Sequence, residues 1–383
     1  MVKKIQYLIW IVAVLTVVVT GCGPKIAPPT SVLETPEYHY KNGLKYLDRD
    51  QIDEALKSFD RAIALEPKSP LGYIGKGLAF GKKGEFKPAF ENMSKGKSLD
   101  KGIDANIGMM RLLSMQRSKG WVEDAESEFK AAQKKDPNSA LPPYYMGMAY
   151  KVALDFDKAA AMFKMVLDMG REFTGEANAE WAVIQKIQRA APGSEIGRKI
   201  ALIDKIDRAD VAALFDQEMN LEKLFTKRGP KAYDTSFKAP TESTTAMATE
   251  TVTKMEPATD IANHWLKPSV DAVLKLQIRG LEAGPNHKFD PDKLITKGEF
   301  ALMLEDILIK VSGDEKLATK FLGATSPFPD IRNDQYFFSA VMTATSRGFL
   351  EADKATGEFK PGDPVSGADA LLSIRVFKDQ LKF

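Results

Sequence analysis

The sequence predicts a mainly α-helical protein, in which a solenoid of helix–turn–helix repeats is followed by smaller helical modules. Three observations predict this. Small and aromatic residues recur at a pitch of about 34 residues between positions 36 and 175. A different set of motifs occurs twice between positions 257 and 383. The chain opens with a basic and then apolar segment, the layout of an export signal.

The N-terminal segment up to Cys22 carries the strongest local signal. Lys3 and Lys4 precede the uncharged run Ile5–Thr20, and Cys22 follows closely. A transmembrane anchor is the alternative, but the run is shorter than the roughly 20 apolar residues of a spanning helix. The ending Val19-Thr20-Gly21-Cys22 resembles the bacterial lipobox. This resemblance implies that residues 1–21 are removed and that Cys22 carries a diacylglycerol.

Cys22 is the only cysteine, so it cannot form a disulfide within the chain. Each buried methylene contributes about 0.8 kcal/mol, and two or three acyl chains make a stable anchor where one does not. Lipoproteins with Asp after the cysteine stay in the inner membrane, whereas Gly23 stands here. We therefore expect a cell-envelope location, lipid-anchored at the outer membrane and facing the periplasm.

Charge is balanced along the rest of the chain. The 54 basic residues include two in segment 1–21, and the 52 acidic residues include none there. A near-neutral chain gives no support for nucleic acid as a partner, which favours a concentrated basic face. Residues 22–35 contain several prolines and predict a tether, and residues 228–256 predict a flexible linker because they lack apolar periodicity.

The repeat in residues 36–175 is set by small residues. Ala55, Ala89, Ala125 and Ala159 recur at intervals of about 34 residues, and one helical turn after each comes Phe59, Met93, Phe129 or Phe163. Gly43, Gly77 and Gly147 each precede their alanine by the same interval. Small residues suit the points where paired helices approach most closely, and the large ones fill the gaps between them. No single unit can bury its apolar face, so several must stack.

This pattern resembles the tetratricopeptide repeat (TPR), a helix–turn–helix unit of about 34 residues. The resemblance implies four repeats over 36–175 and a protein-binding groove lined by the first helix of each. The family's inward positions fall on Tyr40, Leu44, Ile74, Leu78, Met110, Ser114, Tyr144 and Met148. Such an apolar groove suits an amphipathic helix or apolar peptide. The alternative is that the chain's own helix around Glu176–Ala191 fills it.

The second pattern repeats a set of short motifs. Asp260-Ile261 matches Asp330-Ile331, Phe289-Asp-Pro291 matches Phe359-Lys-Pro361, and Ile295–Glu299 matches Val365–Asp369. In order and type these motifs resemble the S-layer homology (SLH) module, most closely in Asp260-Ile-Ala-Asn-His-Trp265 and Ile295-Thr-Lys-Gly-Glu-Phe300. The resemblance implies modules at 257–320 and 321–383. A possible degenerate third copy lies within 176–227, where Ile206–Phe215 has the second-helix signature.

The SLH resemblance also implies a glycan site. In these modules an Arg after the helix cap contacts anionic cell-wall polysaccharide, and its planar fork suits carboxylates. The three positions here are Arg208, Lys297 and Gly367, so we carry the role to Arg208 and Lys297 only. The cap itself has a plainer explanation: Thr296 with Glu299 is a capping box, which starts a helix whether or not a ligand binds.

No catalytic or metal-binding constellation accompanies these modules. His39, His264 and His287 are the only histidines, and none has a nearby nucleophile or metal-ligand spacing. We therefore expect no enzyme, cofactor or metal. The leading hypothesis is an envelope adaptor that binds a protein through the TPR groove and cell-wall polysaccharide or peptidoglycan through the SLH-like modules. The alternative is an outer-membrane or pilus assembly factor, pilotin-like, that acts through the TPR groove alone.

Overall fold

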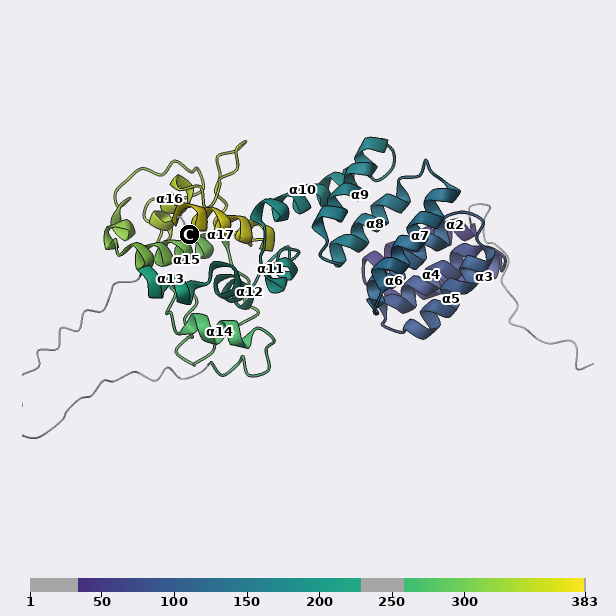
Figure 1. Ribbon diagram of the computed structural model, residues 1–383, viewed down its shortest axis with the longest axis horizontal. Coiled ribbons are helices and arrows are strands. Elements are labelled where there is room, and N and C mark those ends of the chain that lie inside the picture. The colour runs from purple at the N-terminus through teal and green to yellow at the C-terminus, as the bar shows by residue number, and fades with distance from the viewer. Residues whose placement is uncertain (1–33, 229–257, 382–383) are drawn as a thin grey trace, which may run out of the picture. The chain divides into compact units, whose positions relative to one another are not determined.

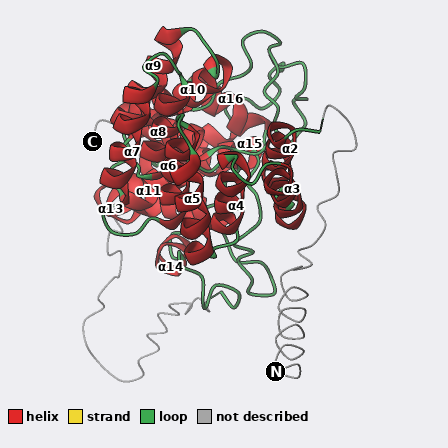
Figure 2. Ribbon diagram, turned by 90° about the vertical axis from the view of Figure 1, so that its right-hand side faces the viewer, coloured by secondary structure: helices red, strands yellow, loops and turns green. Residues whose placement is uncertain are grey.

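The computed structural model describes residues 34–228 and 258–381 (Figure 1). The predicted signal peptide, Cys22, the tether up to residue 33 and the linker from residue 229 lie outside the described residues. Within the described ranges the chain is helical, with isolated β-bridges and no strands (Figure 2). No helix there is long and apolar enough to cross a membrane. The prediction of a mainly α-helical fold is confirmed.

The described residues form two compact units. The first contains 34–153 and 161–177, and the second contains 154–160, 178–228 and 258–381. Helices of the first region follow one another in pairs: α2 (Pro36–Asp48), α3 (Ile52–Leu65), α4 (Pro70–Lys82), α5 (Phe86–Leu99), α6 (Asp104–Gln116), α7 (Trp121–Lys135), α8 (Leu141–Val152) and α9 (Phe156–Met169). The first helices of successive pairs also contact one another, α2 with α4, α4 with α6 and α6 with α8.

The glycines and aromatics of the repeat meet in the core of the first unit. A Cβ added to Gly43 or Gly75 would come 2.3 or 2.2 Å from the ring of Phe59, and one added to Gly147 would come 2.8 Å from Phe163. The four repeat alanines are fully buried. The expectation that small residues mark the closest approaches of the helices, and that large rings fill the gaps, is confirmed at these positions.

Helix α10 (Thr174–Ala190) begins in the first unit and continues in the second. The second unit also contains α11 (Glu195–Ile200), α12 (Arg208–Leu214), the π-helix η1 (Phe215–Met219), α13 (Leu221–Arg228), α14 (Lys267–Leu274), α15 (Lys297–Ser312), the 3₁₀ helix η2 (Glu315–Thr319), α16 (Phe338–Ser346) and α17 (Gly367–Leu381). Helices α12, α15 and α17 begin at the three signature motifs. Capping boxes start α12, through Asp207 and Asp210, and α15, through Thr296 and Glu299.

A closed ring of backbone hydrogen bonds joins these three helix starts. The amide of Ile206 donates to the oxygen of Val365 at 2.9 Å, that of Ile295 to Ile206 at 3.0 Å, and that of Val365 to Ile295 at 3.1 Å. Ile206, Ile295 and Val365 lie just before α12, α15 and α17, respectively. Each donates one of these three hydrogen bonds and accepts another. Ile206, which precedes the undescribed residues 229–257, thus occupies the same kind of position as Ile295 and Val365, which follow them.

The repeated Asp-Ile and Phe-x-Pro motifs have a common structural role. Both carboxylate oxygens of Asp260 accept main-chain hydrogen bonds, from Phe289 at 2.8 Å and Asp290 at 2.7 Å. Asp330 binds Phe359 and Lys360 in the same way, at 2.9 and 2.6 Å. Each aspartate therefore ties the start of its module to the loop that precedes the second helix.

Candidate functional site

The residues predicted to line the TPR groove divide into two groups. Ile74, Leu78 and Met110 are fully buried. Ile74 lies between Gly96 and Gly108, where an added Cβ would come 2.8 Å from its side chain. These three residues pack between successive repeats and offer no surface to a partner, so their placement in an open groove is corrected. Tyr40, Leu44, Tyr144 and Met148 are half-buried and keep some exposed surface.

An aromatic and charged cluster accompanies the half-buried group. The Arg111 guanidinium lies 5.1 Å from the ring centre of Tyr145, which in turn packs edge-on against Tyr144 at 5.2 Å. Burial raises the pKa of the Tyr40 hydroxyl, while the nearby positive charge of Arg111 opposes that rise. Arg111 and Tyr145 escaped the sequence analysis because the family pattern used there singles out other positions on these helices.

The chain itself covers part of this cluster. Phe173, immediately before α10, packs at a tilt against Tyr144 with ring centres 4.7 Å apart, and its ring centre lies 6.2 Å from that of Tyr145. Tyr40 lies on α2, in the first repeat, with its ring 6.0 Å from Phe59. Phe173 therefore covers the Tyr144 end of the predicted groove, whereas among the described residues Phe59 is the only ring packed on Tyr40.

Arg208 and Lys297 occupy matching positions in the second unit. Arg208 donates through Nε to the oxygen of Phe289 at 2.6 Å, and through its two terminal nitrogens to Gly280 and Glu282. Its guanidinium also lies 4.6 Å over the Phe289 ring. Burial lowers its pKa. The side chain holds together the loop of the next module, with its fork directed at backbone carbonyls.

Lys297 does the same for the following module. Its ammonium donates to the oxygens of Glu351 at 2.6 Å and Phe359 at 3.0 Å, and lies 4.4 Å from the centre of the Phe359 ring. Burial lowers its pKa. The third matching position, Gly367, has no room for a side chain, because a Cβ there would lie 1.8 Å from the main-chain oxygen of Ile200. Sequence reasoning found these positions but could not show where their donors point.

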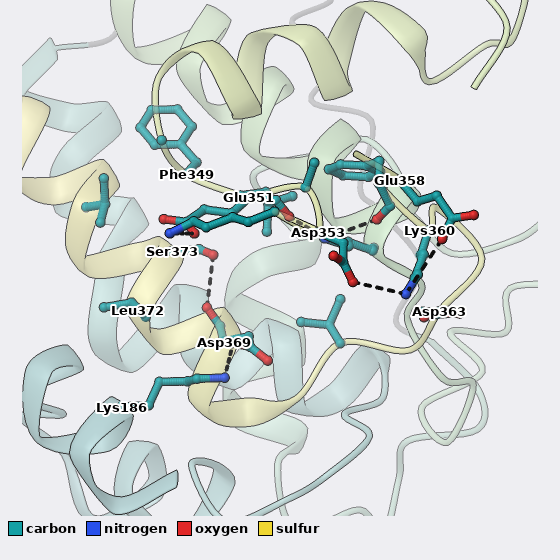
Figure 3. Close-up of a pocket in the computed structure, with 18 of the residues that line it drawn as sticks. Lys186, Phe349, Glu351, Asp353, Glu358, Lys360, Asp363, Asp369, Leu372 and Ser373 are labelled. Carbon is teal, nitrogen blue, oxygen red and sulfur yellow. Dashed lines mark hydrogen bonds and ion pairs between the residues drawn. The ribbon is translucent and has the colours of Figure 1, made fainter. Parts of the chain in front are cut away.

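A cleft opens beside Lys297 in the second unit, with a volume of about 630 Å³. We call it the Lys297 cleft (Figure 3). Its lining comes from four places: α10, the start of α15, the loops on either side of Phe359, and α17. The lining residues are Lys186, Arg189, Lys297, Gly348–Lys354, Glu358–Lys360, Asp363–Val365, Asp369, Leu372, Ser373 and Val376.

Most charges of the cleft are paired. Lys186 of α10 binds the Asp369 carboxylate at 2.6 Å, and Lys360 binds Asp353 at 3.3 Å. Lys186 and Arg189 belong to a helix that no motif singled out. No group of histidine, cysteine or acidic residues suited to a metal ion occurs in the described residues. Charged side chains of both signs line the cleft.

Two family models match parts of this chain. Residues 43–84 match the family model of the TPR repeat, and residues 327–371 match that of the S-layer homology domain. The chain is also similar to the solved structure of a thermophilic TPR protein from Thermus thermophilus. The alignment covers 50% of this chain and 96% of that protein, with 20% sequence identity and a TM-score of 0.35.

The chain thus contains a TPR repeat and an SLH domain, as the motifs predicted. Both are non-catalytic domain families. TPR repeats mediate protein interactions, and SLH domains bind cell-wall polymers. The pair supports an adaptor role, and the SLH domain points to the cell envelope or surface.

Proposed function

We propose that this protein is a lipid-anchored, non-catalytic adaptor of the bacterial cell envelope. Acyl chains on Cys22 hold one end at the outer membrane, the TPR unit binds a protein, and the second unit binds cell-wall polysaccharide or peptidoglycan. The observation that carries the proposal is the Lys297 cleft, a cavity of about 630 Å³ in the SLH-containing unit. Its walls carry both carboxylates and cations, which suits the hydroxyl and acidic groups of a wall glycan.

Arg208 and Lys297 have different roles in this proposal. Lys297 lines the cleft, and its hydrogen bonds to Glu351 and Phe359 fix one wall. Arg208 fixes the corresponding loop around Phe289. Both residues would therefore support glycan binding by shaping loops, and Lys297 also stands close enough to touch the ligand.

The experiment is co-sedimentation of the full chain, kept in detergent micelles, with purified cell-wall sacculi. Retention that saturates with increasing protein supports the proposal. A matched comparison with Lys297→Ala places the site, since loss of that side chain removes one wall of the cleft. Failure of the unaltered chain to sediment with sacculi would remove the glycan half of the proposal.

A second candidate is an assembly factor, pilotin-like, that acts through the TPR unit alone. The observation that favours it is the set of internal hydrogen bonds made by Arg208 and the closed position at Gly367. In that case the surface around Tyr40 and Arg111 would carry the function. Capture of one outer-membrane or pilus subunit that is lost in Arg111→Ala, without any sacculus binding, would favour this candidate.

A further inference from the structure

The Lys297 cleft has few uncommitted charged groups. Three of its cations have acidic partners inside the protein: Lys186 binds Asp369, Lys360 binds Asp353, and Lys354 binds Glu351 at 3.2 Å. A cation already paired with a carboxylate offers less to an anionic ligand, because the incoming anion must compete with the resident one. These three lysines are thus poor candidates for the main ligand contact.

Lys297 is committed as well. Two of its three N–H groups donate to backbone oxygens, and the ammonium packs against the Phe359 ring. No other side chain of the described residues donates a hydrogen bond to either of these two carbonyl oxygens. Moving Lys297 toward a ligand would leave both oxygens without it, which costs free energy when the groups are partly buried. Lys297 is therefore placed to hold the loop in position.

Arg189 is different. It lines the cleft, and its exposed side chain has no hydrogen bond or ion pair with any described residue. It lies three residues after Lys186 on α10, so both share one face of the helix. The ion pair between Lys186 and Asp369 of α17 holds that face against the cleft. Its planar fork of donors matches a carboxylate in a bidentate manner.

One carboxylate of the cleft is also uncommitted. Asp363 is exposed, and within the described part of the chain its side chain has no hydrogen-bond partner. Arg189 and Asp363 together offer one donor fork and one acceptor group. An acidic saccharide presents the matching pair, a carboxylate for the arginine and hydroxyl donors for the aspartate.

We propose that Arg189 is the specificity-determining residue of the Lys297 cleft, and that it binds the carboxylate of an acidic wall glycan. Lys297 is a positioning residue that holds the cleft wall. This inference rests on the proposed function of the second unit. It assigns the ligand contact to α10, which lies outside residues 327–371 that match the SLH model.

The test compares sacculi in their natural state with sacculi whose carboxylates have been converted to amides. The full chain in detergent micelles is expected to bind amidated sacculi about tenfold more weakly. Arg189→Ala is expected to bind natural sacculi about tenfold more weakly and to lose most of its sensitivity to amidation. Arg189→Lys should recover part of the affinity, because it restores the charge without the fork.

The matched control is Arg198→Ala. Arg198 is an exposed arginine of the same unit, does not line the cleft, and should leave binding unchanged. Unchanged binding by Arg189→Ala, or an equal loss in Arg198→Ala, would overturn the inference while leaving glycan binding itself intact. If the unaltered chain binds neither form of sacculus, the proposed function fails and the inference falls with it.

Discussion

The main-chain oxygen of Ile200 lies where a side chain on residue 367 would stand, since a Cβ built on Gly367 comes 1.8 Å from it. At the two matching positions, Arg208 and Lys297 reach toward the oxygens of Phe289 and Phe359 with their long side chains. At the third position the loop has moved in and the backbone itself makes the contact, with the Gly367 amide donating to Ile203 at 2.8 Å. Only glycine leaves room for this arrangement.

Replacing Gly367 is therefore expected to destabilise the second unit. Gly367→Ala forces a methyl group against backbone atoms that cannot rotate away, and we expect a loss of about 3 kcal/mol or more. Gly367→Arg, which restores the family's usual residue, should be worse. Thermal unfolding of the full chain measures both. Gly362→Ala is the control, because nothing lies within 4 Å of a Cβ there. Equal melting temperatures for Gly367→Ala and Gly362→Ala would contradict the close contact at Gly367.

The contact between Gly75 and Phe59 predicts a similar effect in the first unit. Gly75→Ala places a Cβ 2.2 Å from the ring and should cost about 2 kcal/mol. Gly175→Ala, on α10 with nothing within 4 Å, should be neutral or stabilising because alanine favours helix. Chemical denaturation compares the two. The double variant Phe59→Leu with Gly75→Ala should lose less than the sum of its parts, and strict additivity would argue against the contact.

Arg208 predicts a loss of stability that charge alone does not explain. Its three hydrogen bonds end on backbone oxygens of residues 280–289. Arg208→Ala should lower the free energy of unfolding by about 2 kcal/mol or more, because these partly buried oxygens lose a charged donor. Arg198→Ala removes the same charge from the surface and should change it by less than about 0.5 kcal/mol. Similar changes in the free energy of unfolding for both variants would show that Arg208 stabilises the protein no more than an exposed arginine does.

The capping box of α12 predicts a pH dependence of stability. Burial raises the pKa of Asp210 from 3.8 to about 6, and the neighbouring Asp207 adds to the rise. The folded state therefore binds the proton more tightly than the unfolded state. The resulting stability is complete below about pH 4 and is lost as pH rises through about 6.

Asp210→Asn should flatten this dependence. Asparagine keeps an acceptor for the Asp207 amide but carries no charge, so the fall in stability between pH 4 and pH 7 should shrink by on the order of 1 kcal/mol. Urea unfolding across that range measures it. Asp204→Asn removes an exposed acid outside the box and should leave the curve unaltered. A curve for Asp210→Asn that overlays the parent would show that Asp210 does not titrate in this window.

The anchor makes a prediction of its own. Cells that express the unaltered chain should incorporate labelled fatty acid into it and retain it in the membrane fraction. Cys22→Ser should take up no label and leave that fraction, since Cys22 is the only cysteine. Label in the Cys22→Ser variant would place the lipid elsewhere, and membrane retention without label would favour an uncleaved N-terminal helix.

Sequence reasoning predicted the helical repeats because close helix packing demands small residues at fixed positions, as at Gly43, Gly147 and the repeat alanines. It failed at Ile74, Leu78 and Met110, because an apolar residue on an inner helix can face either a groove or the next repeat. Periodicity does not separate these cases. Only three-dimensional packing places Ile74 between Gly96 and Gly108.

The Lys297 cleft could not be predicted from the sequence for a related reason. The signature motif located Arg208 and Lys297, but not the carbonyl oxygens that occupy their donors. Arg189 lies in no motif and is brought to the cleft by the packing of α10 beside α17. A residue whose role depends on an ion pair between segments far apart in the sequence, Lys186 with Asp369, carries no local signal.

The central claim is that this protein links a membrane to the cell wall, and one measurement tests it most directly. Liposomes that carry the lipidated full chain are floated on a density gradient with labelled sacculi. We expect sacculi to rise with the liposomes when the chain is unaltered, to stay behind with Cys22→Ser, and to rise in smaller amounts with Arg189→Ala. Liposomes that hold the unaltered protein yet leave the sacculi at the bottom of the gradient would contradict the claim.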